Sequence, residues 1–123
     1  MIKLIVAGSR TITDKTTVYK LIEDYISDLP KDQSVEIVSG MARGVDDIAA
    51  NFAVDKNYPA RLFPADWEES PKGAGYIRNN KMAEYGTHLL AFWDGESKGT
   101  QHMIEIAKEK GLDVTLIGMW KGK

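Results

Sequence analysis

Short apolar runs and amphipathic stretches alternate along the whole sequence, and this alternation is the feature that most limits the possible folds. Residues 2–7 form a near-continuous apolar run, which is typical of a strand covered on both faces of a sheet. Further strands are predicted at residues 35–38, 60–63, 87–93 and 113–117. Repeated strand–helix units have right-handed crossovers that cover both faces of a parallel sheet. The sequence therefore predicts an α/β Rossmann-like fold, a single three-layer domain over residues 1–123 with a mostly parallel five-stranded sheet.

Capping and breaking residues mark the segments between the predicted strands. Helices are expected after Asp14, from about Val45, and at residues 76–85 and 101–110. Residues 64–75 hold two prolines, two glycines and an acidic cluster around Trp67, which indicates an irregular loop. The C-terminal residues 120–123 are expected to pack and fray.

Composition excludes several kinds of site. The chain has no cysteine, so thiolate nucleophiles, disulfides, Cys-ligated zinc and iron–sulfur clusters are excluded. His88 and His102 lack the spacing of a metal-binding pair, so we expect no metal and no other cofactor. The 16 basic and 18 acidic residues give a net charge of −2, so any anion site must be local. The apolar run at residues 4–7 is too short for a signal peptide or a membrane span, which predicts a soluble cytoplasmic protein without a membrane partner.

The unusual residues of this chain follow the predicted strands, where open parallel sheets bind ligands. Gly8, Ser9 and Arg10 come after the first strand. Glycine allows a tight turn, a hydroxyl can donate a hydrogen bond, and a guanidinium can bind an anion through two bonds. The alternative is that Gly8 only turns the chain and Arg10 lies on the surface. The dinucleotide fingerprint G-x-G-x-x-G is absent from the sequence.

A second candidate loop, SGMARGVDD at residues 39–47, leads directly from the second strand into a helix. Its glycines let backbone N–H groups approach a ligand, and the helix N-terminus favours phosphate. The candidate ligand-binding residues of this loop are Ser39, Gly40, Arg43, Gly44 and Asp46. No Gly-Lys-Ser/Thr follows, so a Walker A site is excluded. The alternative is that the glycine permits the strand exit and Asp46 is only favourable in the first turn of a helix.

The third helix carries Arg78 and Asn79. Arg78 stands at helical spacing from Met82 and Tyr85, so it points inward if that apolar pair faces the sheet. An inward arginine needs an internal carboxylate or a bound anion, because an unpaired buried charge is costly. In the reverse orientation Arg78 is solvated.

The loop after the fourth strand runs from Asp94 to Gly99 and Thr100 at the mouth of a helix, a second helix start suited to phosphate, and these three residues are candidate ligand contacts. Thr100 alternatively serves as the N-cap. Trp67 and Trp93 either stack on a base or pack against the protein.

Together these loops resemble the SLOG superfamily, the Rossmann-like group shared by DNA-processing protein A (DprA) and the LOG nucleotide phosphoribohydrolases, and most closely its small YspA/YpsA-like branch. The paired elements GSR and SGxARGxD carry the resemblance, which extends over about residues 2–114. Arg78 and Met82 fall where LOG enzymes have R-K-x-x-M, with Asn79 replacing the lysine. Gly99 and Thr100 fall where they have P-G-G-x-G-T-x-x-E. The resemblance implies homo-oligomers and a nucleotide-type ligand over the strand ends, with Arg78, Gly99 and Thr100 around its phosphate.

One departure bears on catalysis. Met103 stands where the LOG pattern has a glutamate that is thought to assist cleavage of the N-glycosidic bond. A positioned acid or base contributes roughly 10²–10⁴-fold in rate, so its loss argues against LOG-type hydrolysis. The carboxylates that remain as candidate catalysts are Asp46, Asp66 and Glu96.

Three functions are compatible with these residues. The first is a module that binds, senses or sequesters a nucleotide or nucleotide-derived molecule. The second is a hydrolase or transferase acting on the N-glycosidic bond of a nucleoside, nucleotide or NAD-like substrate. The third is DprA-like binding of single-stranded DNA through Trp67, Lys72, Arg78 and Lys81. Acidic neighbours weaken this third reading, since they repel a phosphate backbone.

Overall fold

The computed structural model describes residues 1–118. Residues 119–123, which include the segment 120–123 that is expected to pack and fray, lie outside the described residues. The strands are β1 (Ile2–Gly8), β2 (Val35–Ser39), β3 (Ala60–Leu62), β4 (His88–Trp93) and β5 (Asp113–Gly118). The helices are α1 (Lys15–Ser27), α2 (Val45–Asp55), α3 (Ala74–Tyr85) and α4 (Lys98–Glu109).

The five strands form one sheet in the order β3-β2-β1-β4-β5, and every neighbouring pair is parallel. From β1 the chain adds β2 and then β3 on one side, and from β4 it adds β5 on the other side. The strand order therefore reverses between β1 and β4, which are hydrogen-bonded neighbours. The loops that leave these two strands therefore diverge to opposite faces. This arrangement confirms the predicted α/β Rossmann-like fold.

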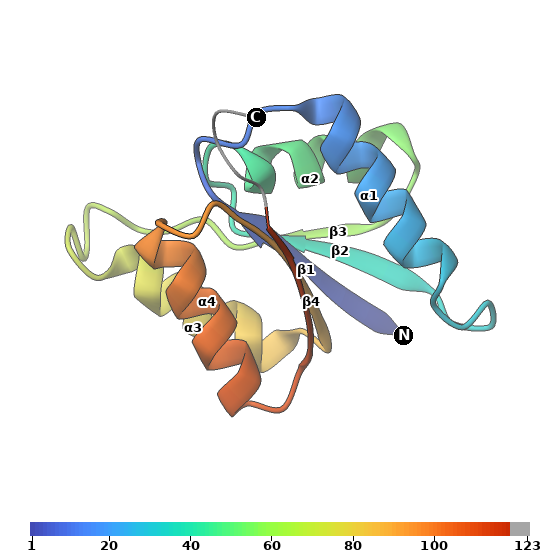
Figure 1. Cartoon of the computed structure of the whole chain (residues 1–123). Helices are drawn as coiled ribbons and strands as arrows, with labels where there is room; N and C mark the ends of the chain where they lie inside the picture. The colour runs from blue at the N-terminus through green and yellow to red at the C-terminus, as the bar shows by residue number, and fades with distance from the viewer. Residues whose placement is uncertain (119–123) are drawn as a thin grey trace.

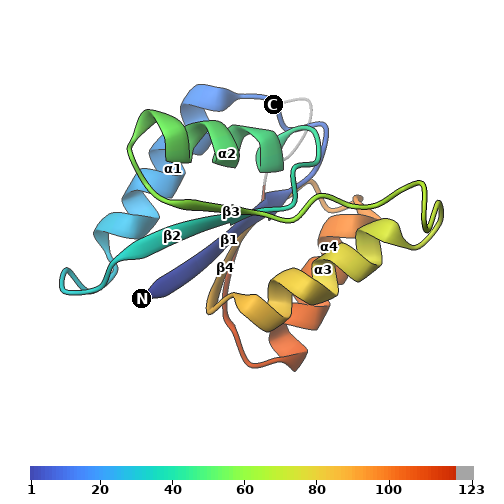
Figure 2. The same cartoon turned by 180° about the vertical axis from the view of Figure 1, so that it is seen from behind.

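Two helical layers enclose the sheet, with α1 and α2 on one face and α3 and α4 on the other (Figures 1 and 2). Successive side chains of β1 point to opposite faces of the sheet and pack against the two helical layers in turn. Leu4 packs in a core with Phe52 of α2, whereas Ile5 packs in the opposite core with Met82 of α3 and Met103 of α4. The run at residues 2–7 is nearly all buried because both of its faces are covered.

Two helices begin earlier than the sequence predicts. The fourth begins at Lys98 instead of residue 101, because the Ser97 hydroxyl caps it by accepting a hydrogen bond from the Thr100 amide at 3.3 Å. The reading of Thr100 as the N-cap is therefore wrong, and Gly99 lies within the first turn. The third begins at Ala74 instead of residue 76.

The stretch between β3 and α3 is irregular, as predicted, and projects from the side of the molecule (Figure 1, yellow-green). Strand β3 ends at Leu62, one residue earlier than predicted, and all three of its residues are exposed. It lies at the edge of the sheet and, among the strands within residues 1–118, pairs with β2 alone.

Candidate functional site

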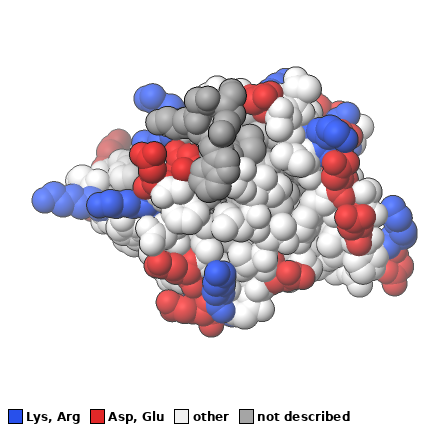
Figure 3. Space-filling model, in the orientation of Figure 1, with Lys and Arg blue, Asp and Glu red and all other residues white. Residues whose placement is uncertain are grey.

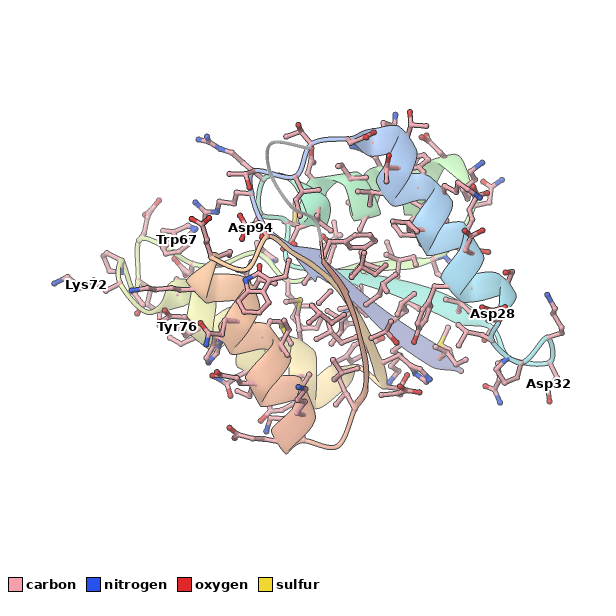
Figure 4. The ribbon with its side chains drawn as sticks, viewed as in Figure 1. Asp28, Asp32, Trp67, Lys72, Tyr76 and Asp94 are labelled. Atoms are coloured by element: carbon pink, nitrogen blue, oxygen red, sulfur yellow. The ribbon has the colours of Figure 1, made fainter. Side chains whose placement is uncertain are left out.

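Candidate residues from the loops after β1, β2 and β4 and from α3 meet where these three strands end. In a parallel sheet, the divergence of the loops between β1 and β4 leaves a crevice at the carboxyl ends of the strands. Figure 4 shows Trp67, Lys72, Tyr76 and Asp94 on this side of the molecule, whereas Asp28 and Asp32 lie at the opposite end. These segments are far apart in the sequence, and they come together because the carboxyl ends of parallel strands lie at the same edge of the sheet.

Gly8 and Ser9 bring the first loop close to β4. A Cβ on Gly8 would lie 2.5 Å from the carbonyl oxygen of Phe92, so only glycine allows this approach. Ser9 is fully buried; its amide donates to the same carbonyl at 3.0 Å, and its hydroxyl accepts from the Asp94 amide at 3.1 Å. Arg10 follows them and is exposed. Ser9 holds two loops together, and its contact with a ligand stays a prediction.

Asp94 organises the loop after β4. Its carboxylate accepts from the amides of Glu96 at 2.8 Å and Ser97 at 3.0 Å, and from the Thr11 hydroxyl at 3.0 Å. The two backbone hydrogen bonds, with smaller contributions from the Thr11 and Ser9 hydroxyls, lower the pKa of Asp94 to about 2. The charged carboxylate thus fixes the loop that leads into α4, and its predicted ligand contact is untested.

The loop after β2 is held by its own polar side chains. The Ser39 hydroxyl donates to the Asp46 carbonyl at 2.7 Å and accepts from the Met41 amide at 3.1 Å. The Asp46 carboxylate accepts from the Ala42 amide at 3.4 Å. Gly44 has φ of +77° and precedes α2. Ser39 is fully buried, so its role in this structure is to shape the loop.

Arg78 points inward, as the first of its two predicted orientations requires. Its Nη1 donates to the Gly40 carbonyl and its Nε donates to the Asn79 side chain at 3.0 Å. A Cβ on Gly40 would lie 2.6 Å from Nη1 of Arg78 and 2.8 Å from Oδ2 of Asp46, so both charged groups face this glycine. Asp46 is therefore an internal carboxylate near Arg78, one of the two kinds of partner that an inward arginine needs.

Burial and mutual attraction compete in setting the pKa values of Asp46 and Arg78. Asp46 is 4% exposed, and its burial raises its pKa to about 6, although the charges of Arg78 and Arg10 act in the opposite direction. Burial likewise lowers the pKa of Arg78, and the charge of Asp46 opposes that change. With a pKa of about 6, Asp46 is mostly ionised near pH 7, and an arginine side chain stays protonated in proteins.

Asn79 joins α3 to the start of α4. Its side-chain amide donates to the Gly99 carbonyl at 3.3 Å and lies 3.1 Å from Nδ1 of His102. The His102 ring in turn packs on Tyr76, with the ring centres 4.5 Å apart. Tyr76 and His102 were missed as site residues because neither belongs to a recognisable motif. Their partners come from a different helix, so no pattern within one helix reveals the contact.

These segments line a small cavity of about 70 Å³. We call it the switch hollow because it lies at the topological switch point, where the strand order reverses between β1 and β4. It is lined by Ala7, Gly8, Arg10, Ala42, Asp46, Arg78, Asn79, Ser97, Gly99 and Thr100. A cavity needs roughly 10–15 Å³ of such volume to hold one water molecule. The switch hollow therefore has room for a few water molecules, a space comparable in size to one phosphate group. Two guanidinium groups and the first turn of α4 thus meet one buried carboxylate around a space of that size.

Two shallower spaces adjoin the switch hollow. The outer hollow, of about 210 Å³, is lined by Arg10, Trp67, Lys72, Gly75, Tyr76, Arg78, Asn79 and Gly99. A wider, more open groove is lined by Arg10, Met41, Ala42, Arg43 and Trp67. Arg10 borders all three spaces, so a bound molecule that extends out of the switch hollow passes this side chain.

Several predicted residues do not line the switch hollow, among them Glu96, Asp66 and Trp93. Glu96 is exposed on the loop after β4. Asp66 accepts from the Glu69 amide at 3.0 Å and lines a separate cavity beside β3. The Trp93 indole donates to the Ser97 carbonyl at 3.0 Å and packs in the core of α3 and α4, which favours the packing reading of this tryptophan. Of the three candidate catalytic carboxylates, Asp46 alone lines the hollow.

Charges of both signs are distributed over the surface. In Figure 3, acidic and basic side chains alternate around the rim of the face shown, and its centre is largely uncharged. No large patch of a single sign lies on the face shown. Within residues 1–118, no group of three or more acidic or histidine side chains is arranged to hold a metal ion.

The strand order and the connections define a Rossmann-like fold with a crevice at the carboxyl ends of the strands, and sequence comparison gives the family. Residues 2–69 match the model of the YspA, cpYpsA-related SLOG family. The "Gene 61 protein" of Mycobacterium phage D29 is 36% identical over 124 residues, covering 96% of this chain and 98% of the phage protein. The chain belongs to the YspA, cpYpsA-related SLOG family.

Two solved structures share the fold. DNA processing protein A (DprA) from Streptococcus pneumoniae has a TM-score of 0.78 and 19% identity over 100% of this chain. DprA from Helicobacter pylori, described as binding single-stranded DNA, has a TM-score of 0.65 and 18% identity over 99% of this chain. This chain spans about half of the first protein, 52%, and 67% of the second. At these identities, the likeness shows the fold alone.

Proposed function

We propose that residues 1–123 form one nucleotide-binding domain and that the switch hollow holds the phosphate of a nucleotide-type small molecule. One observation carries this proposal: Arg10, Arg78 and the first turn of α4 come from three distant segments to line one phosphate-sized space. Guanidinium groups form strong charge-assisted hydrogen bonds to phosphate. The N-terminus of a helix adds amide donors and a partial positive charge. Gly99 leaves that turn accessible, since a Cβ there would meet nothing within 4 Å.

The outer hollow suits the base of such a ligand. Trp67 and Tyr76 are 48% and 46% exposed, and both line this space. Aromatic faces of this kind stack on nucleobases with little preference among them. The two hollows share Arg10, Arg78, Asn79 and Gly99, so the base and phosphate places are contiguous.

Arg10→Ala tests the proposal because Arg10 is exposed and its removal leaves the core intact. We expect this change to weaken binding of nucleoside 5′-monophosphates by about 10–100-fold in calorimetric titrations, the loss of one charge-assisted bond. Arg61→Ala, an exposed arginine on β3 that packs over Phe63 and Tyr85, is the matched control and should bind like wild type. Equal affinities for Arg10→Ala and wild type would contradict the proposal.

Single-stranded DNA is the second candidate ligand, supported by the description of Helicobacter pylori DprA. Arg43, Lys72 and Trp67 border the groove and the outer hollow, where a nucleic acid strand would pass. Binding through a phosphate backbone weakens steeply with salt. Oligothymidylate that binds at low salt, weakens steeply at moderate salt and is not displaced by mononucleotides would favour this candidate.

Turnover of the bound nucleotide can be assayed separately. Asp46 lines the switch hollow, whereas Asp66 and Glu96 lie elsewhere. Free base released from AMP, CMP or NAD by wild type, and not by Asp46→Asn, would assign cleavage of the N-glycosidic bond to this site. Release that persists without any of the three carboxylates would rule them all out as catalysts.

The expected homo-oligomers and cytoplasmic location stay predictions. No helix within residues 1–118 has both the length and the apolar character needed to cross a membrane. Light scattering of the purified protein gives its assembly state.

A further inference from the structure

We propose that the open edge of β3 binds an extended peptide of a partner protein as an added strand, antiparallel to β3. Such a peptide carries an apolar side chain between a basic residue on its N-terminal side and an acidic residue on its C-terminal side. Binding there does not depend on a nucleotide in the switch hollow. Outward-facing main-chain groups of β3 and an adjacent groove with opposite charges at its two ends point to this site.

β3 presents main-chain groups to the open side of the sheet. The Phe63 amide donates to the Ser39 carbonyl at 2.8 Å, so the main chain of Phe63 faces β2. Alternation along a strand turns the amides and carbonyls of Ala60 and Leu62 the other way. Both residues are exposed, and no strand within residues 1–118 pairs with that side. An added strand would therefore find donors and acceptors at both residues, which is how peptides bind exposed sheet edges.

The cavity beside β3, of about 240 Å³, lies next to this edge, and we call it the edge groove. Its walls are the chain at the end of β3 and the side of α3, which runs back after the projecting loop (Figure 2). Ile77 of α3 lines it and is 48% exposed. Phe63 also lines it and packs against the core under α3 and α4. A peptide side chain opposite Phe63 lies on the same face of the sheet, so it enters the edge groove beside Ile77.

The two ends of the edge groove carry opposite charges. Asp66 and Glu69 line it where the projecting loop leaves β3, and Lys81 lines it further along α3. At 1.5 Å per residue, Lys81 lies about 10 Å along the helix from Ala74, toward the amino ends of the strands. Arg78 also lines the groove, but its Nε and Nη1 donate to acceptors within the protein.

These charges give an added strand its direction. The N-terminal half of an antiparallel strand lies beside the carboxyl end of β3. A basic residue in that half meets Asp66 and Glu69, and an acidic residue in the other half meets Lys81. Charge complementarity of this kind fixes register and rejects wrong partners.

A second copy of this chain fits the edge less well than a separate peptide. The symmetric register that pairs the whole of β3 with the same strand of another copy places Arg61 opposite Arg61, and like charges directly opposite each other are destabilising. The register that pairs Leu62 with Leu62 places Pro64 opposite Ala60, and proline has no N–H to donate. A peptide of different sequence has neither constraint.

The test titrates a synthetic peptide, Lys-Thr-Leu-Val-Glu-Thr with both ends blocked, into the labelled full-length protein by nuclear magnetic resonance. In the proposed register its leucine lies opposite Phe63, its valine opposite Leu62, and its glutamate opposite Arg61 and toward Lys81. We expect saturable binding with the largest changes at the amides of Ala60 and Leu62. The reversed sequence, Thr-Glu-Val-Leu-Thr-Lys, has the same composition and should bind about tenfold or more weakly, because an antiparallel strand then meets like charges at both ends.

Methylated peptides separate strand addition from simple occupation of the groove. An N-methyl group on the valine removes the N–H that faces Leu62, and we expect it to weaken binding about tenfold or more. An N-methyl group on the glutamate changes an N–H that faces away from β3. That peptide should bind like the parent.

Two protein variants locate the peptide. Ile77→Asp puts a charge into the edge groove at a position that is half exposed in the free protein, and it should weaken binding about tenfold or more. Val54→Asp is the matched control, since Val54 is 74% exposed on α2, on the other face of the sheet. It should bind the peptide like wild type.

Three results would overturn the proposal. The first is no binding to folded wild type by the peptide or by its forms with isoleucine, valine or phenylalanine in place of leucine. The second is equal affinity for the forward and reversed sequences, or for the two methylated peptides. The third is a dimer in light scattering that Ile77→Asp converts to a monomer, which would give the edge to a second copy. If Ile77→Asp does not fold, as circular dichroism would show, the methylated pair still decides.

Discussion

Gly44→Ala is expected to destabilise the protein by more than about 3 kcal/mol. Gly44 has φ of +77° and ψ of −128°, a region of backbone conformation open almost only to glycine. A Cβ there would also lie 2.6 Å from the Ser9 carbonyl oxygen and 2.8 Å from the Arg10 Cα, and both are backbone atoms that cannot move aside cheaply. Strain of about 1–3 kcal/mol and overpacking of similar size act together.

Gly111→Ala is the matched control for Gly44→Ala. Gly111 has a similar φ of +80°, but a Cβ there would meet nothing within 4 Å. Gly111→Ala should lower the free energy of unfolding by only about 1 kcal/mol, because it adds backbone strain without a steric clash. Urea unfolding measures both changes. If the two variants lose equal stability, the close approach of the first two loops is not as the structure has it.

Gly99→Leu is expected to weaken nucleotide binding by about 100-fold or more while the free energy of unfolding is kept or slightly raised. Gly99 lies in the first turn of α4 and borders both hollows, and a Cβ there meets no atom within 4 Å. A leucine side chain therefore enters the space assigned to the ligand without disturbing the protein. Leucine also has a better helix propensity than glycine, by about 0.8 kcal/mol.

A second leucine substitution controls for the added side chain. Gln101→Leu places it two residues along the same helix at an exposed position, and it should bind nucleotides like wild type. Calorimetric titration and thermal unfolding of both variants give the two readouts. Unchanged affinity in a stable Gly99→Leu variant would exclude the switch hollow as the ligand site.

The fold could be predicted because each apolar run carries its own evidence. A strand that is buried on both faces needs apolar side chains at nearly every position, and residues 2–7 have such a sequence. Helix boundaries were less certain because several residues can cap one helix. Ser97 and Thr100 are both good N-cap residues, and only the hydrogen bond between them shows which one caps α4.

The loops of the candidate site could be predicted from the position of strand ends, whereas the roles within them could not. The ligand contacts predicted for Ser9 and Ser39 stay predictions, and the structure adds that both side chains are fully buried and bond to the protein's own backbone. The spacing of Arg78 from Met82 and Tyr85 leaves an inward and a solvated orientation open, and the structure has the inward one. The partner of Arg78 is Asp46, 32 positions earlier, and only the packing of α3 beside the loop after β2 brings them together.

Nuclear magnetic resonance titration of the labelled protein with a nucleoside 5′-monophosphate tests the central claim, that the phosphate lies in the switch hollow. We expect the largest changes at the amides of Gly8, Gly99 and Thr100 and at the Arg78 Nε–H, all of which border the hollow. Residues 27–34, at the opposite end of the sheet beside a separate cavity, should not change. Changes confined to that opposite end, or to the cavity beside β3, would contradict the claim.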